Sequence, residues 1–410
     1  MIQVSLVTAL LGVGLLLLVR RFQRPWWQVT AVRRALYVVA FAATVGSIVR
    51  YIGKSTQMPS ISAIGSFLAA GFILVVALYL SLPFAGLLRS LGTRLLLRKA
   101  APTEPPAPLV TQAADASRLA ARPAITATAP LVSRRTVLEA VVAAAPVTAF
   151  GLGAAGIAGG FDGTRVTNRP LSFSGLAPGL AGLRIMQITD LHLGAFFGPS
   201  SIPALVEKIA AARPDLLVFT GDICDHLPYL EPALRQLEAV IPALGAYAVM
   251  GNHEYYRGER ATRRIYDKTR IQMITNTHRT LQVGGDKLVL VGVDDPAGYE
   301  RAAEPHARLA DIALDGAPSD GFKLGLCHRP SGFRTLAARG IDLTLSGHTH
   351  GAQIGIAERS VLEPFLPDWY LWGEYELDGK QLYTSSGAGH WAAFRLACPS
   401  EAPLIQLASR

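Results

Sequence analysis

The segment that most constrains this chain is residues 346–351, Ser-Gly-His-Thr-His-Gly, which directly follows the apolar run 343–345. Residues two apart on extended backbone point to the same side, and a turn just after a strand can direct His348 and His350 into one cavity. One such pair is weak evidence by itself. It indicates a metal site only if further ligands lie elsewhere in the chain.

Four other apolar runs in the carboxyl-terminal part of the chain also end in polar residues. These runs are residues 183–188, 216–219, 247–250 and 322–326. Each is typical of a buried strand. The polar residues that follow them are Asp190 and His192, then Asp222, then Asn252, His253 and Glu254, and finally His328. The pattern predicts an α/β domain whose polar residues meet at the carboxyl ends of strands, where open α/β sheets place their sites.

Between the first two runs, Ile202, Leu205 and Ile209 have helical spacing. Ser200 and Ser201 precede them, so we expect a helix with a serine cap. A strand, a helix and a strand within about 40 residues predict a right-handed crossover between parallel strands.

Carboxylate, neutral imidazole and amide oxygen together suit borderline cations such as Zn²⁺, Mn²⁺ and Fe. Each residue has an ordinary alternative: Asp190 or Asp222 alone could cap a turn, and His328 alone could be a hydrogen-bonded core histidine. Five such elements at strand ends favour the metal interpretation. The three cysteines, Cys224, Cys327 and Cys398, are widely spaced, and we expect them to be small buried residues.

Read in order, the motifs are Asp-x-His, Gly-Asp, Gly-Asn-His-Glu, His and Gly-His-x-His, and over about residues 180–410 they resemble the calcineurin-like metallophosphoesterases. The chain is most similar to a membrane-associated bacterial branch that contains the YkuE/YaeI-type phosphodiesterases and a type of UDP-2,3-diacylglucosamine pyrophosphatase. The stretches 292–296, 382–389 and 398–401 carry this closer resemblance. The chain departs from the pattern at Ala352, where glycine is usual, and at 329–331, where Asn-Pro-Asp is common. Arg329 could therefore alter what the pocket accepts.

The resemblance implies a sandwich of two β-sheets flanked by helices and a pair of divalent cations, Mn, Zn or Fe. It assigns one cation to Asp190, His192, Asp222 and His350, and the other to Asp222, Asn252, His328 and His348, with Asp222 bridging. A hydroxide between the cations would attack a phosphodiester, a phosphomonoester or a pyrophosphate.

The resemblance assigns catalytic roles to the bridging Asp222 and to His253, which would act as general acid or charge stabiliser. We expect Glu254 to orient His253, and Asp225 to lie behind the ligands or to form a turn. His226, His278 and His306 match no motif and are expected at the surface. For His390, a substrate contact and a surface position both stay open.

Charge divides the chain into two parts. Residues 1–160 hold 15 Lys and Arg against three acidic residues, whereas residues 161–410 hold 24 Lys and Arg against 27 acidic residues. Positive charge thus flanks the apolar runs of the first part, as in membrane proteins, and the second part lacks the positive balance expected for a nucleic-acid partner.

The runs 2–19, 35–49 and 61–88 predict three transmembrane helices within residues 1–99. Residues 100–133 are rich in Pro and Ala and predict a linker. Residues 134–160 predict a fourth transmembrane helix or, because of Arg134 and Arg135, a twin-arginine-like export signal.

By the positive-inside rule, residues 161–410 should face the periplasm or the cell exterior, carried by a multi-pass section in the cell membrane. A short tether favours substrates at the membrane surface, including a lipid-linked envelope phosphate ester. The aromatic residues that could contact lipid, or else pack normally, are Phe196, Phe197, Phe365, Trp369 and Trp372. The alternative function is a membrane sensor or scaffold that uses the metal domain for binding without turnover. The oligomeric state stays open.

Overall fold

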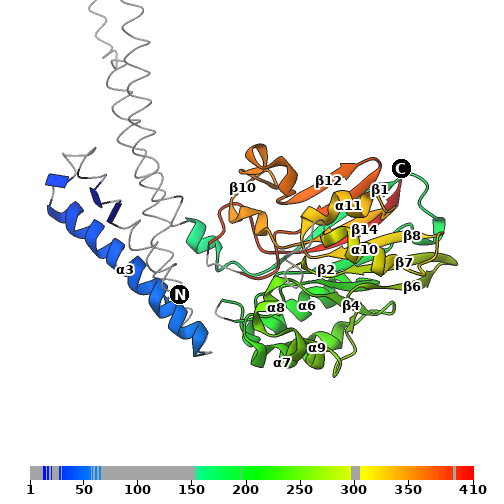
Figure 1. Ribbon diagram of the computed structural model, residues 1–410, viewed down its shortest axis with the longest axis horizontal. Helices are drawn as coiled ribbons and strands as arrows, with labels where there is room; N and C mark the ends of the chain where they lie inside the picture. The colour runs from blue at the N-terminus through cyan, green and yellow to red at the C-terminus, as the bar shows by residue number, and fades with distance from the viewer. Residues whose placement is uncertain are drawn as a thin grey trace, which may run out of the picture. The chain divides into compact units, whose positions relative to one another are not determined.

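The computed structural model describes residues 155–194, 196–296, 305–390 and 394–410, together with 30–56, single positions between 13 and 65, and Leu152 (Figure 1). Helix α3 (Thr30–Ser55) includes the predicted span 35–49. Among the described residues, no helix combines the length and the apolar composition that a bilayer crossing needs. The other three predicted spans and the linker lie largely or wholly outside the described residues, so the membrane section stays a prediction.

Two six-stranded mixed sheets form the main part of the domain. The first has the order β1 (Arg165–Phe173), β14 (Glu401–Ser409), β2 (Arg184–Ile188), β3 (Leu216–Thr220), β4 (Ala246–Val249) and β5 (Gln272–Met273). The second has the order β12 (Gly373–Leu377), β13 (Lys380–Thr384), β9 (Leu343–Ser346), β8 (Phe322–Cys327), β7 (Asp286–Val293) and β6 (Thr277–Val283). Strands β2 to β5 are parallel to one another, as are β13, β9, β8 and β7. All five predicted strands are present within one or two residues of their expected bounds.

The two sheets pack against each other through a shared apolar core. Ile185 and Val218 of the first sheet belong to the same buried cluster as Leu290, Leu324 and Leu345 of the second. Alternate residues of a strand point to opposite faces, so the neighbours of these residues point outward, toward helices. Burying one such side chain contributes roughly 1.5–3 kcal/mol.

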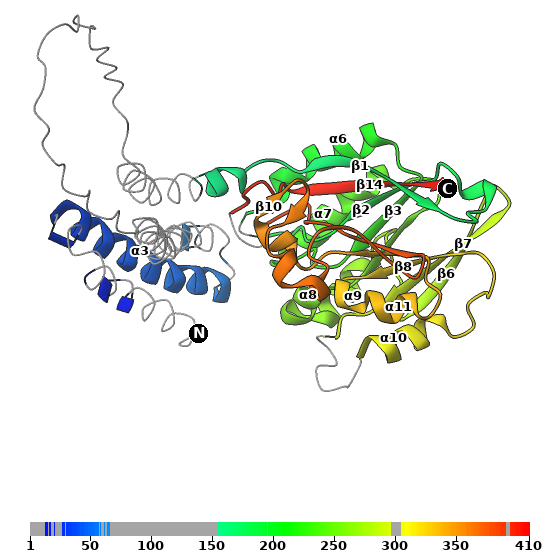
Figure 2. The ribbon, with the colours of Figure 1, turned by 90° about the horizontal axis from the view of Figure 1, so that it is seen from above.

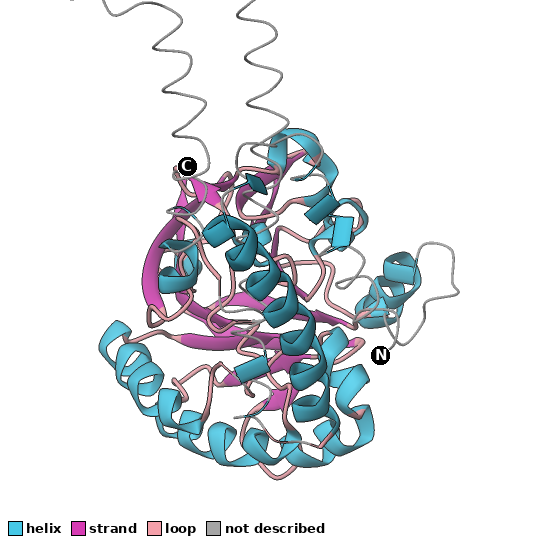
Figure 3. Cartoon of the chain, turned by 90° about the vertical axis from the view of Figure 1, so that its left-hand side faces the viewer, coloured by secondary structure: helices cyan, strands magenta, loops and turns pink. Residues whose placement is uncertain are grey.

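Helices cover the outer face of each sheet (Figures 2 and 3). The outer face of the first sheet packs against α6 (Ile202–Ala212) and α7 (Leu230–Leu237), and that of the second against α10 (Pro305–Leu314). The shorter helices are α8 (Asn252–Arg257), α9 (Glu259–Tyr266) and α11 (Phe333–Ala337). The predicted sandwich of two sheets flanked by helices is thus confirmed.

One sequence-based expectation about a single residue needs correction. Ser201 makes no side-chain cap hydrogen bond to α6, because residues Pro199–Ser201 already form a 3-10 turn, η2, that leads into the helix. For Phe197 and Trp372, which are buried, the packing alternative holds. Phe365 and Trp369 do lie at the surface, with 78% and 59% of their areas exposed.

Candidate metal centre

The motif residues gather where strands of both sheets end. Asp190 and His192 follow β2, and Asp222 follows β3. From the second sheet, His328 follows β8, and the segment with His348 and His350 follows β9. Asn252 and His253 begin α8, just after β4. The structure brings six of the seven predicted ligands together in two groups, and the seventh, Asn252, directly precedes His253, whose backbone N–H donates to Asp222.

One group of ligand atoms comprises Asp190, His192 and His350. The Nε2 atoms of the two imidazoles lie 3.0 Å apart, and Asp190 Oδ1 lies 3.4 Å from His350 Nε2 and 3.8 Å from His192 Nε2. Metal–nitrogen bonds of 2.0–2.1 Å in a tetrahedral site place neighbouring ligand atoms roughly 3.3 Å apart. The spacing of the three atoms fits a cation at their centre.

A second group comprises Asp222, His328 and His348. His328 Nδ1 lies 2.8 Å from the carbonyl oxygen of Thr220 and must donate to it, so Nε2 is directed at Asp222 Oδ2, 3.3 Å away. His328 Nε2 and Asn252 Oδ1 are both buried and have no hydrogen-bond partner. A buried polar atom without a partner is costly, and a cation would satisfy both atoms. The residues present thus fit a metal at this position as well.

Asp222 lies between the two groups. Its Oδ1 accepts a hydrogen bond from the backbone N–H of His253, at 2.8 Å. Its Oδ2 lies 3.8 Å from His192 Nε2 and 3.3 Å from His328 Nε2, one imidazole from each group. One carboxylate oxygen therefore faces both groups.

Electrostatics at the site favours a cation. Burial alone would raise the pKa of Asp222, but the neighbouring imidazoles hold it well below its usual range, so the carboxylate is ionised. Burial lowers the pKa of His328, yet the charge of Asp222 raises it to about 10, which reports a strongly negative potential. At His348, burial and the positive charges of His328 and Arg329 lower the pKa to about 3, so its imidazole is neutral, as a metal ligand must be.

Five of these residues have left-handed backbone. Asp190, His192, Asp222, His348 and His350 have φ values of 53°, 47°, 54°, 71° and 51°. This region is uncommon for residues with a side chain and stores roughly 1–3 kcal/mol of strain at each. The sharp turns direct the side chains back over the strand ends.

Two motif glycines leave room for the carboxylates. A Cβ atom at Gly347 would collide with Asp190 Oδ2, and one at Gly251 would collide with Asp222 Oδ1. The glycines before His348 and Asn252 are therefore required by the close approach of the ligands.

His253 is oriented by Asp225, which corrects the expectation for Glu254. Asp225 Oδ1 lies 2.6 Å from His253 Nδ1 and also accepts a hydrogen bond from Arg257 Nη2 at 2.9 Å. The other ring nitrogen of His253, Nε2, lies 3.9 Å from Asp222 Oδ2 and so faces the site. His192, Asp225 and His253 also form a third compact group of ligand atoms.

Glu254 supports the turn that carries Asp222. Its carboxylate accepts hydrogen bonds from the backbone N–H groups of Asp222, Ile223, Cys224 and Gly251, at 2.7–3.1 Å. Four bonds from one buried side chain hold the turns after β3 and β4 together. Burial and the charge of Asp222 raise the pKa of Glu254 to about 7.

The motifs did not reveal the role of Arg395. This arginine is buried, donates to the carbonyl oxygens of Ser386 and Gly389 at 2.8 and 2.7 Å, and lies 3.4 Å from His350 Nδ1. Its Nε donates to His390 Nδ1 at 3.2 Å, so the surface alternative for the buried His390 is wrong. An arginine in no motif offers no sequence signal for such a contact.

The remaining histidines and the cysteines lie outside the two groups around Asp222. His226, His278 and His306, which we expected at the surface, are half-buried. The three cysteines are free and buried, as predicted. Burial raises the pKa of the Cys327 thiol to about 12.

Comparison with known proteins agrees with this geometry. Residues 183–352 match the calcineurin-like phosphoesterase family. An uncharacterized metallophosphoesterase of Campylobacter jejuni is 32% identical over 234 residues, which cover 55% of this chain and 59% of the relative. A transmembrane protein with metallophosphoesterase domain from Danio rerio is 27% identical over 284 residues, which cover 67% of this chain and 63% of the relative. The uncharacterized metallophosphoesterase YkuE of Bacillus subtilis is 28% identical over 233 residues, which cover 54% of this chain and 78% of the relative.

The chain spans about three fifths of the length of the first two of these relatives. The family match contains all the ligand candidates, from Asp190 to His350. The domain that holds the candidate metal centre is therefore similar in sequence to the calcineurin-like metallophosphoesterases.

Proposed function

We propose that residues 161–410 form a binuclear metal-dependent phosphoesterase. Asp190, His192, Asp222 and His350 would hold one divalent cation, and Asp222, Asn252, His328 and His348 the other. The observation that carries the proposal is the position of Asp222 Oδ2, which faces imidazoles of both groups at 3.3 and 3.8 Å. Mn, Zn and Fe all suit this mixture of oxygen and nitrogen ligands.

Two cations at such a site supply charge neutralisation for the phosphoryl oxygens and activation of the attacking water. The residues of the chain supply position and proton transfer. Because Asp225 binds Nδ1 of His253, the opposite nitrogen can carry a proton toward the leaving oxygen, and the carboxylate stabilises the charged ring.

Membrane anchoring is part of the proposal. Support comes from the apolar runs with their positive flanks in residues 1–160 and from a relative whose name describes a transmembrane protein. The substrate would then be a phosphate ester near the outer surface of the membrane, including lipid-linked diesters and pyrophosphates.

Asp222→Asn tests the binuclear assignment, because one residue sets both the charge and the separation of the pair. We expect the full-length variant to hold fewer metal ions, counted by mass spectrometry, and to lose almost all hydrolysis of generic mono- and diesters. Asp267→Asn, an exposed aspartate at the end of α9, is the matched control and should keep metal content and activity.

A variant Asp222→Asn with two tightly bound ions and normal turnover would contradict the proposal. A wild-type protein that holds both ions and hydrolyses no phosphate ester would favour a sensor or scaffold instead.

A further inference from the structure

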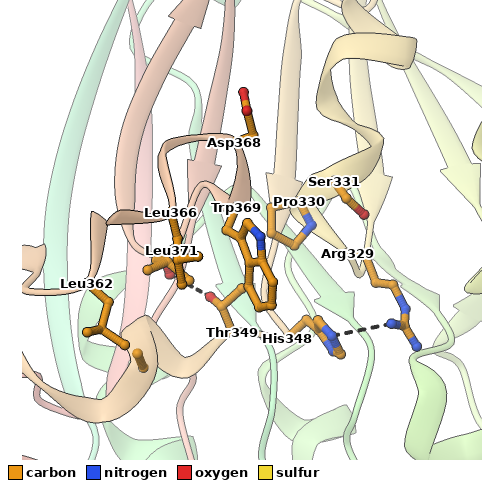
Figure 4. A pocket seen from close by; sticks show the side chains of 11 residues that line it. Arg329, Pro330, Ser331, His348, Thr349, Leu362, Leu366, Asp368, Trp369 and Leu371 are labelled. Carbon is orange, nitrogen blue, oxygen red and sulfur yellow. Dashed lines mark hydrogen bonds between the residues drawn. The ribbon is translucent and has the colours of Figure 1, made fainter. Parts of the chain in front are cut away.

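A cavity of about 590 Å³ lies beside the metal centre (Figure 4). Its lining includes Arg329, His348, Thr349, Leu366, Trp369 and Leu371. His348 belongs to both the cavity lining and the second ligand group, so the cavity adjoins the candidate metal centre. The volume lies in the range of pockets that bind small molecules, about 300–1,000 Å³.

The far wall of the cavity is apolar. Leu362, Leu366 and Leu371 lie on one side, and the ring of Trp369 stands between them and Arg329 (Figure 4). These residues come from the connection between the two-residue strand β11 (Arg359–Ser360) and β12, which contains the short turns η8 (Glu363–Phe365) and η9 (Pro367–Trp369). Asp368 is paired on the exposed side with Arg334 at 2.8 Å, so its charge is compensated away from the apolar wall.

A positive charge stands at the end of the cavity nearest the metal centre. Arg329 Nε donates to the fully buried Asp295 carboxylate at 2.8 Å, and Arg329 Nη1 lies 3.5 Å from His348 Nε2 (Figure 4). The buried carboxylate holds the guanidinium in place next to a ligand candidate. A fixed guanidinium is well suited to bind a phosphate oxygen.

The turn with the ligand histidines is also joined to the apolar wall. The Thr349 hydroxyl donates to the carbonyl oxygen of Leu371, and Thr349 lies between His348 and His350. An apolar group in the cavity would therefore lie at a fixed distance from a phosphate at the metal centre.

We infer that this cavity binds the apolar chain of an amphiphilic phosphate ester whose phosphate contacts Arg329 beside His348. The inference rests on the proposed phosphoesterase function and narrows its substrate class. A small hydrophilic ester would make no use of the apolar wall, because the leucine side chains would stay in contact with water when it binds. Charge at one end and leucines at the other match a headgroup phosphate that carries a hydrocarbon chain.

Binding of n-alkylphosphonates, from ethyl to decyl, tests the cavity separately from catalysis. The full-length, metal-loaded protein is titrated by calorimetry at one fixed detergent concentration, below the aggregation limit of each ligand. Each added methylene should tighten binding about fourfold until the cavity is filled. The same compounds should inhibit hydrolysis of a generic diester competitively, with the same dependence on chain length.

Two variants of the wall should reduce this dependence. Leu366→Ser removes a half-buried contact, and Trp369→Ser removes a largely exposed one, so at least the second should fold normally. Phe365→Ser is the matched control, because Phe365 is an exposed apolar residue of the same segment that does not line the cavity. Arg329→Gln should weaken binding of every phosphonate by about 10- to 100-fold, independent of chain length.

The outcomes separate the inference from the proposed function. Hydrolysis of the generic diester together with equal affinity for ethyl- and decylphosphonate overturns the inference and leaves the phosphoesterase intact. Equal effects of Phe365→Ser and Trp369→Ser would overturn it too, because the chain would then bind outside the cavity. Chain-dependent binding without any hydrolysis retains the amphiphile site and overturns the proposed function.

Discussion

His253 faces the metal centre from a position that leaves its ring free of both ligand groups around Asp222. Its Nδ1 is held by Asp225 at 2.6 Å, and its Nε2 points toward Asp222. The expectation for Glu254 failed for a physical reason. Glu254 lies one residue further along α8, where its carboxylate meets four backbone N–H groups that need acceptors. Motif spacing predicts which acids lie near the site, but the folded turns decide which acid contacts which donor.

His253→Ala should separate proton transfer from metal binding. Loss of general acid help typically costs about 10²- to 10⁴-fold in rate, and it should cost less for esters with good leaving groups, which need no proton. Metal content should persist. His278→Ala, a half-buried histidine on β6, is the control and should keep normal rates. Equal losses for poor and good leaving groups would rule out the acid role.

At the scale of elements, the ligands are divided between the two sheets. Asp190 and Asp222 follow strands of the first sheet, and His328 and His348 follow strands of the second. The carboxyl ends of neighbouring parallel strands share an edge, which is why apolar runs with polar ends were sufficient to predict the meeting of these residues. The pairing of strands into two sheets came only from the family resemblance, because local patterns do not encode the partner of a strand.

Metal removal should therefore weaken the contact between the sheets. A ligand that binds only the folded state at about 1,000 times its Kd stabilises it by about 4 kcal/mol, which corresponds to roughly 10 °C in Tm for a domain of this size. We expect the Tm of the domain to fall by about that amount after treatment with a chelator, measured by differential scanning calorimetry, and to recover with added Mn²⁺ or Zn²⁺. For Asp222→Asn, treatment with the chelator should lower the Tm much less. Identical Tm values for the wild type with and without chelator would contradict this prediction.

Two buried aromatic residues show where sequence patterns are insufficient at this scale. Trp372 precedes β12 and donates its Nε1–H to the buried Glu401 of β14, at 2.9 Å. Phe197 belongs to the cluster beneath α6. The Trp372 contact joins residues 29 apart in the sequence, and the Phe197 contact depends on how the turn before α6 folds, so an aromatic residue in a loop was ambiguous until these elements were placed.

At the scale of the whole chain, the charge distribution predicts where the domain lies. Five arginines occur between residues 20 and 34, and further positive charge extends from Arg89 to Arg135. If these segments are cytoplasmic, the domain lies outside. Protease added to intact spheroplasts should digest the domain, while a cytoplasmic marker protein stays intact. Digestion only after lysis would place the domain, and its substrate, at the cytoplasmic face.

The left-handed backbone of the five ligand residues has an evolutionary consequence. At such positions glycine relieves roughly 1–3 kcal/mol of strain, whereas the native Asp or His is retained only because it serves the site. Mutation to glycine would therefore remove a ligand candidate while the metal-free fold keeps its stability. The stability of the metal-free fold then gives the site no protection, and only selection for metal binding or for its use maintains these residues. When that selection relaxes, a well-folded descendant with an incomplete metal site is one or two substitutions away.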